Sequence, residues 1–225
     1  MLLICDHAGR RIPLNLGDLG LRVADLERHI AWDIGAAGLA RRLADAIGAE
    51  LILQTYSRLV ADCNRDPGSP DIAPEISDGS LVPGNAALDE DALKARIEEI
   101  HTPYHAAISA ALDLRPAATV VSIHSFTPQM NGFARPWHVG VLHTHDSPVS
   151  MRMLEALAGD EDLVVGDNQP YAMDGIDYTI PRHAKGRGLD YLELEVRQDL
   201  IADEAGQARM AARLAPMIAA AAMAG

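Results

Sequence analysis

Residues 1–13 read MLLICDHAGRRIP, and this stretch decides the fold class of the chain. Leu2–Cys5 is an apolar run with the length of a short buried strand, and it ends at the polar pair Asp6–His7 before a glycine. In open α/β sheets, ligands bind in the crevice outside the carboxyl ends of such strands. The stretch therefore indicates an α/β protein whose functional side chains begin at the end of its first strand.

Two later stretches repeat this pattern. Val120–Ile123 leads into His124, and Tyr191–Arg197 carries Glu193 and Glu195 inside an otherwise strand-like segment. Two histidines and a buried glutamate at strand ends are typical of a hydrolytic metal site.

The remaining chain alternates between strand and helix patterns, which predicts an α/β sandwich around a mixed sheet. Pro103 should kink or split the expected helix 89–113, and the Pro- and Gly-rich stretch 64–87 is expected to be a long loop. Because no linker divides the sequence, we expect a single domain over residues 1–225. The expected strands are 2–6, 50–56, 58–63, 119–124, 138–143, 162–166 and 190–196, and the expected helices are 32–48, 89–113, 148–159 and 203–223.

The amino-acid composition limits the classes of partner and substrate that we expect for this protein. A net charge of −13 argues against nucleic acid as a partner. A small anionic substrate would need local arginines, which make up 17 of the 19 basic residues. Cys5 and Cys63 are expected to be reduced and buried. The N-terminal apolar run is too short for a signal peptide, and Leu214–Gly225 is too short for a membrane span, so we expect a cytoplasmic protein that binds no membrane.

His7 and His124 are the candidate metal ligands, because a buried imidazole needs partners for both nitrogens. Asp33, in the stretch 29–35, is the candidate carboxylate. Two histidines, a carboxylate and an open position for water form a common catalytic zinc set. Alternatively, Asp33 caps the helix that follows it.

Glu193 and Glu195 share one face of their strand, because strand side chains alternate. Burying both is unfavourable unless they are paired or functional, so one of them is a candidate general base. An edge strand with a solvated face is the alternative.

Arginines and neighbouring polar residues are the candidates for binding an anionic substrate. Asn64–Arg65, at the end of the expected strand 58–63, could grip a carboxylate, and Arg135 could stabilise an oxyanion. Arg182 and His183 lie in a glycine-containing loop that could fold over the substrate. For each of these the alternative is a surface position. The other histidines, the pair His143 and His145 included, are interpreted as structural or surface residues.

In these stretches the sequence resembles the N-formylglutamate amidohydrolase family of zinc enzymes. The resemblance implies a zinc carboxypeptidase-like three-layer α/β/α fold, with His7, Asp33 and His124 as zinc ligands. It implies Glu195 rather than Glu193 as general base, and Asn64 and Arg65 as the carboxylate grip. The matching stretches keep their order over nearly the whole chain and are 6–13, 29–36, 62–65, 122–126 and 194–200.

The sequence is therefore interpreted as a zinc-dependent amidohydrolase acting on an N-formyl or N-acyl acidic amino acid such as N-formylglutamate. Two alternatives stay open: a carboxypeptidase-like peptidase acting on small peptides, and a non-catalytic, metal-stabilised binding protein of the same fold.

Overall fold

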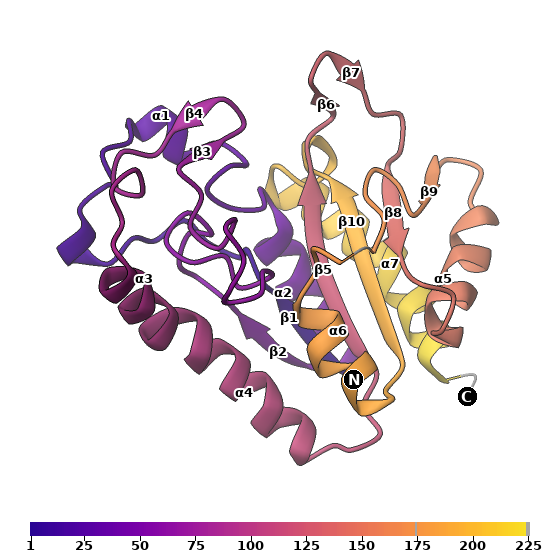
Figure 1. Cartoon of the computed structure of the whole chain (residues 1–225). Coiled ribbons are helices and arrows are strands. Elements are labelled where there is room, and N and C mark those ends of the chain that lie inside the picture. Colours follow the sequence, from indigo (N-terminus) through magenta and orange to yellow (C-terminus); the bar gives the residue numbers. More distant parts are fainter. Residues whose placement is uncertain (174, 224–225) are drawn as a thin grey trace.

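The computed structural model describes residues 1–173 and 175–223 and has a six-stranded mixed sheet at its centre (Figure 1). The strand order is β2-β1-β5-β10-β8-β9. Neighbouring strands are parallel except β10 and β8, which are antiparallel. The strands are β1 (Leu2–Cys5), β2 (Glu50–Leu53), β5 (Val120–Phe126), β8 (Val139–Leu142), β9 (Val165–Asp167) and β10 (Tyr191–Arg197).

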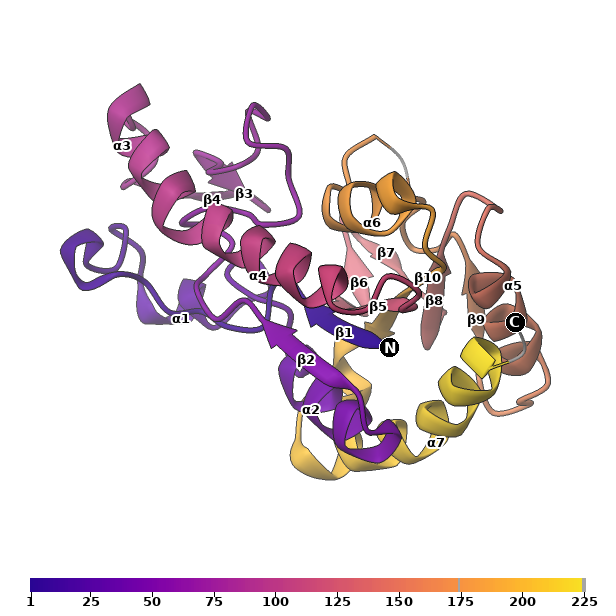
Figure 2. The ribbon, with the colours of Figure 1, turned by 90° about the horizontal axis from the view of Figure 1, so that it is seen from below.

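Helices cover both faces of the sheet, as the view in Figure 2 shows. On one face α2 (Ala36–Ile47), α5 (Pro148–Ala158) and α7 (Glu204–Met223) pack over strand residues such as Leu3 and Leu194. On the other face α4 (Thr102–Asp113) and α6 (Thr179–His183) pack over residues such as Leu2 and Tyr191. The expected three-layer α/β/α sandwich is therefore confirmed.

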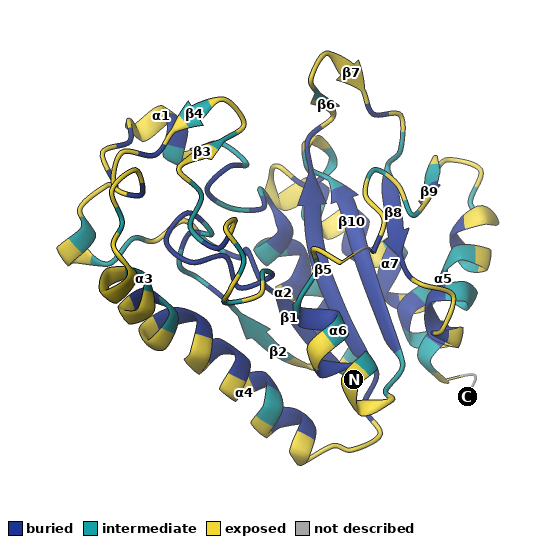
Figure 3. Cartoon of the chain, in the orientation of Figure 1, coloured by how far each residue is buried: buried dark blue, intermediate teal, exposed yellow. Residues whose placement is uncertain are grey.

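On the face of the sheet that α4 and α6 cover, the side chains of β5 and β10 change from apolar to polar along each strand. On this face β5 presents Val120, Ser122 and then His124, while β10 presents Tyr191 and then Glu193 and Glu195. All of these side chains are buried. The alternation of strand side chains thus gathers the polar residues at one end of one face. Figure 3 shows the central strands β5 and β10 as buried.

The prediction of a strand over residues 58–63 is wrong. Residues 58–63 form turns instead, in which the backbone N–H of Val60 donates to the carbonyl of Ser57 and that of Asp62 donates to Ile72. The apolar residues of this run are buried in the core under α4 without joining the sheet.

The expected helices differ mainly at their boundaries. The first begins at Ala36 rather than at residue 32, because Gly35 adopts a positive φ of 82°. The expected helix 89–113 is divided into α3 (Glu90–Arg96), a π-helical turn (Ile97–His101) and α4, in which Pro103 occupies the first turn. The change of helical register next to Pro103 agrees with the predicted interruption.

Smaller elements surround the carboxyl ends of β1, β5 and β10. The long loop 64–87 contains a short hairpin, and a second hairpin extends β5 beyond the sheet (Figure 1). Both cysteines are buried and free, as expected. No helix among the described residues is both long and apolar enough to cross a membrane. The additional elements are α1 (Val23–Leu26), β3 (Ile76–Ser77), β4 (Ser80–Leu81), β6 (Gln129–Met130) and β7 (Phe133–Ala134).

Candidate metal centre and active site

His7, Asp33 and His124 converge at the carboxyl ends of β1 and β5. Each offers a ligand atom within 4.8 Å of the other two, and all three side chains are buried. Nδ1 of His7 lies 3.5 Å from Oδ1 of Asp33, and Nδ1 of His124 lies 3.0 Å from Oδ2. The fold thus brings together the three predicted ligand residues from separate parts of the chain.

Asp33 is not a helix cap. The residue before α2 is Gly35, and the Asp33 carboxylate accepts hydrogen bonds from the His124 ring and from the backbone N–H of Ser125. Its own backbone N–H donates to the carbonyl of His7 at 2.9 Å, which ties this loop to the end of β1. The loop therefore holds the carboxylate over the sheet rather than over the helix.

Two further carboxylates orient the imidazoles. Nε2 of His7 donates to Asp62 at 2.7 Å, and Nε2 of His124 lies 3.2 Å from Oδ2 of Asp6 and 3.0 Å from Ser122 Oγ. Both rings therefore turn Nδ1 toward Asp33. Carboxylate partners of this kind fix the orientation of metal-binding histidines and raise their basicity. The sequence analysis gave neither Asp6 nor Asp62 a role, although each lies in a stretch that carries the family resemblance.

The donor set fits a metal ion. Nδ1 of His7 is buried and makes no hydrogen bond within the described part of the chain, although it faces the Asp33 carboxylate. A cation among the three side chains would satisfy this nitrogen. Two imidazole nitrogens with one carboxylate are also a common ligand set of catalytic metal sites.

The electrostatics of the metal-free cluster favour charged carboxylates and protonated imidazoles. Burial by itself raises the pKa of Asp6, but the hydrogen bond and charge of His124 outweigh it and bring this pKa to about 2. Burial likewise opposes protonation of His124, yet Asp33 and Asp6 hold its pKa well above the ordinary value. The pKa of His7 is raised as well, because Asp62 and Asp33 outweigh burial and the charge of Arg58.

Glu193 and Glu195 both face this cluster from β10. The strand is central rather than at an edge, so the solvated-face interpretation is wrong. Glu195 pairs with His124 across the β5–β10 ladder, and burial raises its pKa to about 8. The charges of His124, Asp33 and His7 all act on Glu195. Glu193 Oε1 instead lies 3.8 Å from Nε2 of His124, the nitrogen that faces Asp6.

A cavity of about 610 Å³ opens beside the cluster. Its lining includes the three candidate ligands, both glutamates, Asn64 and Arg65. It also includes Arg58, which the sequence analysis did not single out because it fell inside the expected strand 58–63. The Arg58 guanidinium donates to Asp62 at 2.8 and 3.0 Å and lies 3.6 Å from Asp33.

Asn64 and Arg65 reach the cavity from a turn rather than from a strand end. The Asn64 side chain accepts hydrogen bonds from the backbone N–H groups of Tyr178 and Thr179 and donates to Asp177 at 3.0 Å. These bonds hold the segment before α6. One guanidinium nitrogen of Arg65 donates to the Asn64 carbonyl. Arg65 is therefore better placed than Asn64 to meet a substrate.

Three other expected site residues do not line this cavity. Arg135 donates to Thr127 and lies between the rings of Phe126 and Tyr171, at 5.9 and 4.8 Å from their centroids. Tyr171, Phe126 and Thr127 line the cavity, so Arg135 contacts its lining without belonging to it.

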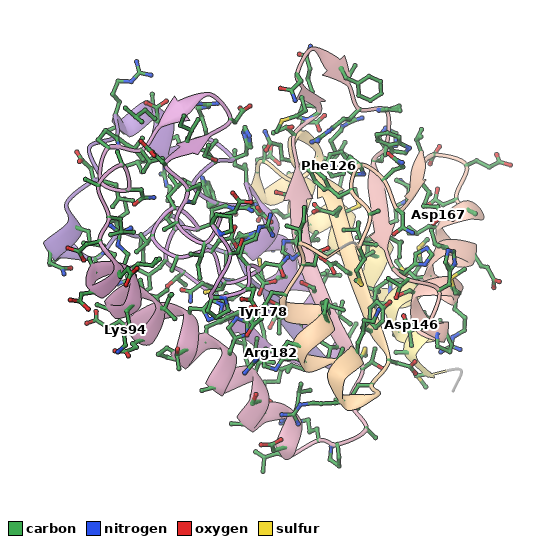
Figure 4. The ribbon with its side chains drawn as sticks, in the orientation of Figure 1. Lys94, Phe126, Asp146, Asp167, Tyr178 and Arg182 are labelled. Carbon is green, nitrogen blue, oxygen red and sulfur yellow. The ribbon has the colours of Figure 1, made fainter. Side chains whose placement is uncertain are left out.

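Arg182 and His183 belong to α6 rather than to a loop. His183 is buried and hydrogen-bonded to His105 at 2.8 Å. Arg182 lies against Tyr178 beside a separate, smaller cavity of about 220 Å³ (Figure 4). These two residues therefore do not line the cavity beside His7, Asp33 and His124.

Comparisons with known proteins agree with this fold. The family model described as N-formylglutamate amidohydrolase matches residues 1–202. The crystal structure of gene product Atu2144 from Agrobacterium tumefaciens is 40% identical, with a TM-score of 0.94 over 98% of this chain and 89% of that chain. N-formylglutamate amidohydrolase from Ralstonia eutropha JMP134 is 18% identical, with a TM-score of 0.67 over 99% and 92% of the two chains, and shares the fold. No curated protein matches the chain.

Proposed function

The chain belongs to the N-formylglutamate amidohydrolase family and is an amidohydrolase; from this premise we propose that it uses zinc to hydrolyse an N-formyl or N-acyl amino acid with a free carboxylate. The convergence of His7, Asp33 and His124 beside Glu195 in one cavity carries the proposal. N-formylglutamate, which the family description names, represents this substrate class. We further propose that residues 1–225 act as one amidohydrolase domain.

His7, Asp33 and His124 would hold the metal, which supplies a Lewis acid for the amide carbonyl and the attacking water. Glu195 accepts the proton of that water and returns it to the leaving nitrogen. A pKa near neutrality suits a residue that must both take and release a proton. Glu193 lies on the same face, and burial and the charge of Asp177 hold its pKa well above the ordinary value.

Arginines of the turn 57–65 bind and polarise the substrate. Arg65 binds the substrate carboxylate, for which a guanidinium offers a two-pronged donor. Arg58, rather than Arg135, is the arginine next to the cluster and stabilises the developing oxyanion. Both residues line the cavity.

The test is metal analysis combined with a substrate panel. His7→Ala, Asp33→Ala and His124→Ala should each lose zinc, because removing one of three protein ligands removes much of the affinity. Wild-type protein loaded with zinc should hydrolyse N-formyl or N-acetyl amino acids. Full zinc stoichiometry in all three variants would contradict the ligand set, and wild-type zinc without any turnover would favour the binding-protein alternative.

A carboxypeptidase-like activity is the second candidate. One wall of the cavity is formed by residues 71–78 of the long loop, and its volume of about 610 Å³ leaves room for more than a single amino acid. Dipeptides with a free carboxyl end therefore belong in the same substrate panel. Faster turnover of dipeptides than of N-acyl amino acids would favour this alternative.

A further inference from the structure

The cavity offers few positive charges to a substrate. Among the described residues that line it, the arginines and lysines are Arg58 and Arg65. Arg58 is already paired with Asp62 and lies close to Asp33. The pKa of His29, a further lining residue, is lowered by burial, so its ring is neutral near pH 7. Arg65 alone is left for a substrate carboxylate, and it can match only one.

The wall beyond the metal cluster is acidic. It includes Asp71, which is exposed, Asp78, which pairs with Arg28 at 2.7 Å, and Asp177, which accepts a hydrogen bond from Asn64. A second substrate carboxylate placed here would approach like charges. The described lining offers it neutral donors such as Ser77 and Thr127 but no second unpaired arginine or lysine. Burying an ionised carboxylate without an opposite charge is unfavourable.

The mouth of the same cavity is apolar. Ile76 of β3 is 64% exposed, and Ile176 and Tyr171 of the segment before α6 are 53% and 41% exposed. Met130 of β6 joins them in the lining. Large exposed apolar side chains around a concave site mark a surface that binds an apolar group. These residues come from three separate segments that all contribute to the lining of this cavity.

From this distribution we infer that the substrate carries a single carboxylate and a large apolar side chain rather than the acidic side chain of glutamate. The inference rests on the proposed function, since it assigns the side chain of the N-acyl amino acid that the site would hydrolyse. Arg65 holds the one carboxylate, and Ile76, Tyr171 and Ile176 surround the side chain.

The test measures binding separately from turnover. Zinc-loaded Glu195→Gln protein is titrated by calorimetry with N-formylleucine, N-formylglutamine and N-formylglutamate. N-formylleucine should bind at least about tenfold more tightly than N-formylglutamate, because the second carboxylate finds no cationic partner. N-formylglutamine should fall between them, since it keeps the shape of glutamate and loses the charge. Equal or tighter binding of N-formylglutamate, or no binding of any of the three, would overturn the inference.

A matched pair of variants tests the apolar mouth. Ile76→Ser should weaken N-formylleucine binding roughly three- to tenfold, the effect of losing a few methylene contacts, and leave N-formylalanine unchanged. Leu81 is the matched control, because it pairs with Ile76 on the same hairpin, is 54% exposed and does not line the cavity. Equal effects of Ile76→Ser and Leu81→Ser would contradict the assignment.

Turnover by the wild-type enzyme distinguishes failure of the proposed function from failure of the proposed apolar specificity. Selective binding of N-formylleucine without hydrolysis of any N-acyl amino acid would refute the proposed function and leave the apolar specificity standing. Hydrolysis that is fastest with N-formylglutamate would support the proposed function and refute the apolar specificity.

Discussion

His7 and His124 each lie between two carboxylates, and this arrangement decides which ring nitrogen faces the cavity. Asp62 and Asp6 take the Nε2 atoms, so both Nδ1 atoms turn toward Asp33. Glu195 then approaches the cluster from β10. The chemistry of the site therefore depends on the orientation of its histidines as much as on their presence.

The two glutamates should differ in their effect on catalysis. Glu195→Gln is expected to keep the metal and to lower kcat by about 10²–10⁴-fold, the usual loss for a general base. Glu193→Gln should lower kcat much less, because Glu193 lies nearest the Nε2 side of His124. Metal content and kcat of both variants check this. An essential Glu193 beside a dispensable Glu195 would reverse the assignment.

Arg65→Lys tests the carboxylate contact. Lysine keeps the charge but lacks the fork of the guanidinium, so KM for an N-acyl amino acid should rise by the equivalent of about 1.5–3 kcal/mol while zinc content stays unchanged. The variant should also discriminate less between a free acid and its amide. If wild type and variant prefer the free acid by the same factor, Arg65 does not bind the substrate carboxylate, and Arg135, Arg182 or His183 becomes the better candidate.

Single residues of the site could be predicted where the local pattern is unusual. His7, His124 and Glu195 follow or interrupt apolar runs, which the sequence displays directly. Arg58, Asp6 and Asp62 could not be singled out, because an arginine or aspartate in a loop resembles any surface residue until its partners are known. The role of Arg135 stays a prediction, and its contact with the Tyr171 ring could not be read from the sequence.

At the scale of elements, the turn 57–65 is the clearest difference between expectation and structure. The run Leu59–Cys63 has the apolar composition of a strand, and a short buried segment of any conformation has the same composition. Its conformation is fixed by distant hydrogen bonds, such as that from Asp62 to Ile72. The central strands were predictable because each is a longer apolar run bounded by turn residues.

Asn64 is expected to stabilise this turn against α6 rather than to bind substrate. In Asn64→Ala, the buried backbone N–H of Thr179 and that of Tyr178 lose their acceptor, at about 1–3 kcal/mol for each buried unsatisfied group. The free energy of unfolding in urea should fall accordingly, and Arg65→Lys is the control that should leave it unchanged. Unaltered stability together with a raised KM would instead support Asn64 as part of the carboxylate grip.

At the scale of the whole molecule, binding of the proposed metal would be linked to stability through the protonated histidines. Because the folded-state pKa values of His7 and His124 are raised, their ion pairs contribute stability to the metal-free protein below about pH 6.5, the ordinary histidine value. That contribution is lost as the pH rises through the raised values. Metal binding displaces the same protons, so its affinity increases over the same range.

Removal of the metal should therefore destabilise the protein more at pH 8 than at pH 6. The expected readout is the decrease in Tm caused by a chelator, measured at both pH values at equal free chelator concentration. A metal that binds only the native state stabilises it by mass action. His124→Ala protein, which lacks a ligand, should show little chelator effect at either pH. A pH-independent decrease in the wild-type protein would exclude proton displacement from these histidines.

The position of β5 between β1 and β10 also has a consequence for how the chain assembles. The contact between Asp33 and His124 joins residues 91 positions apart, and Glu195 comes from the last strand of the sheet. A growing chain therefore cannot present all three candidate ligands until His124 has been synthesised. Glu195, the proposed general base, is added later still. Such distant pairings form late and slowly. The proposed metal would thus be captured in a final step of folding, by a finished sheet, rather than act as a nucleus around which the sheet grows.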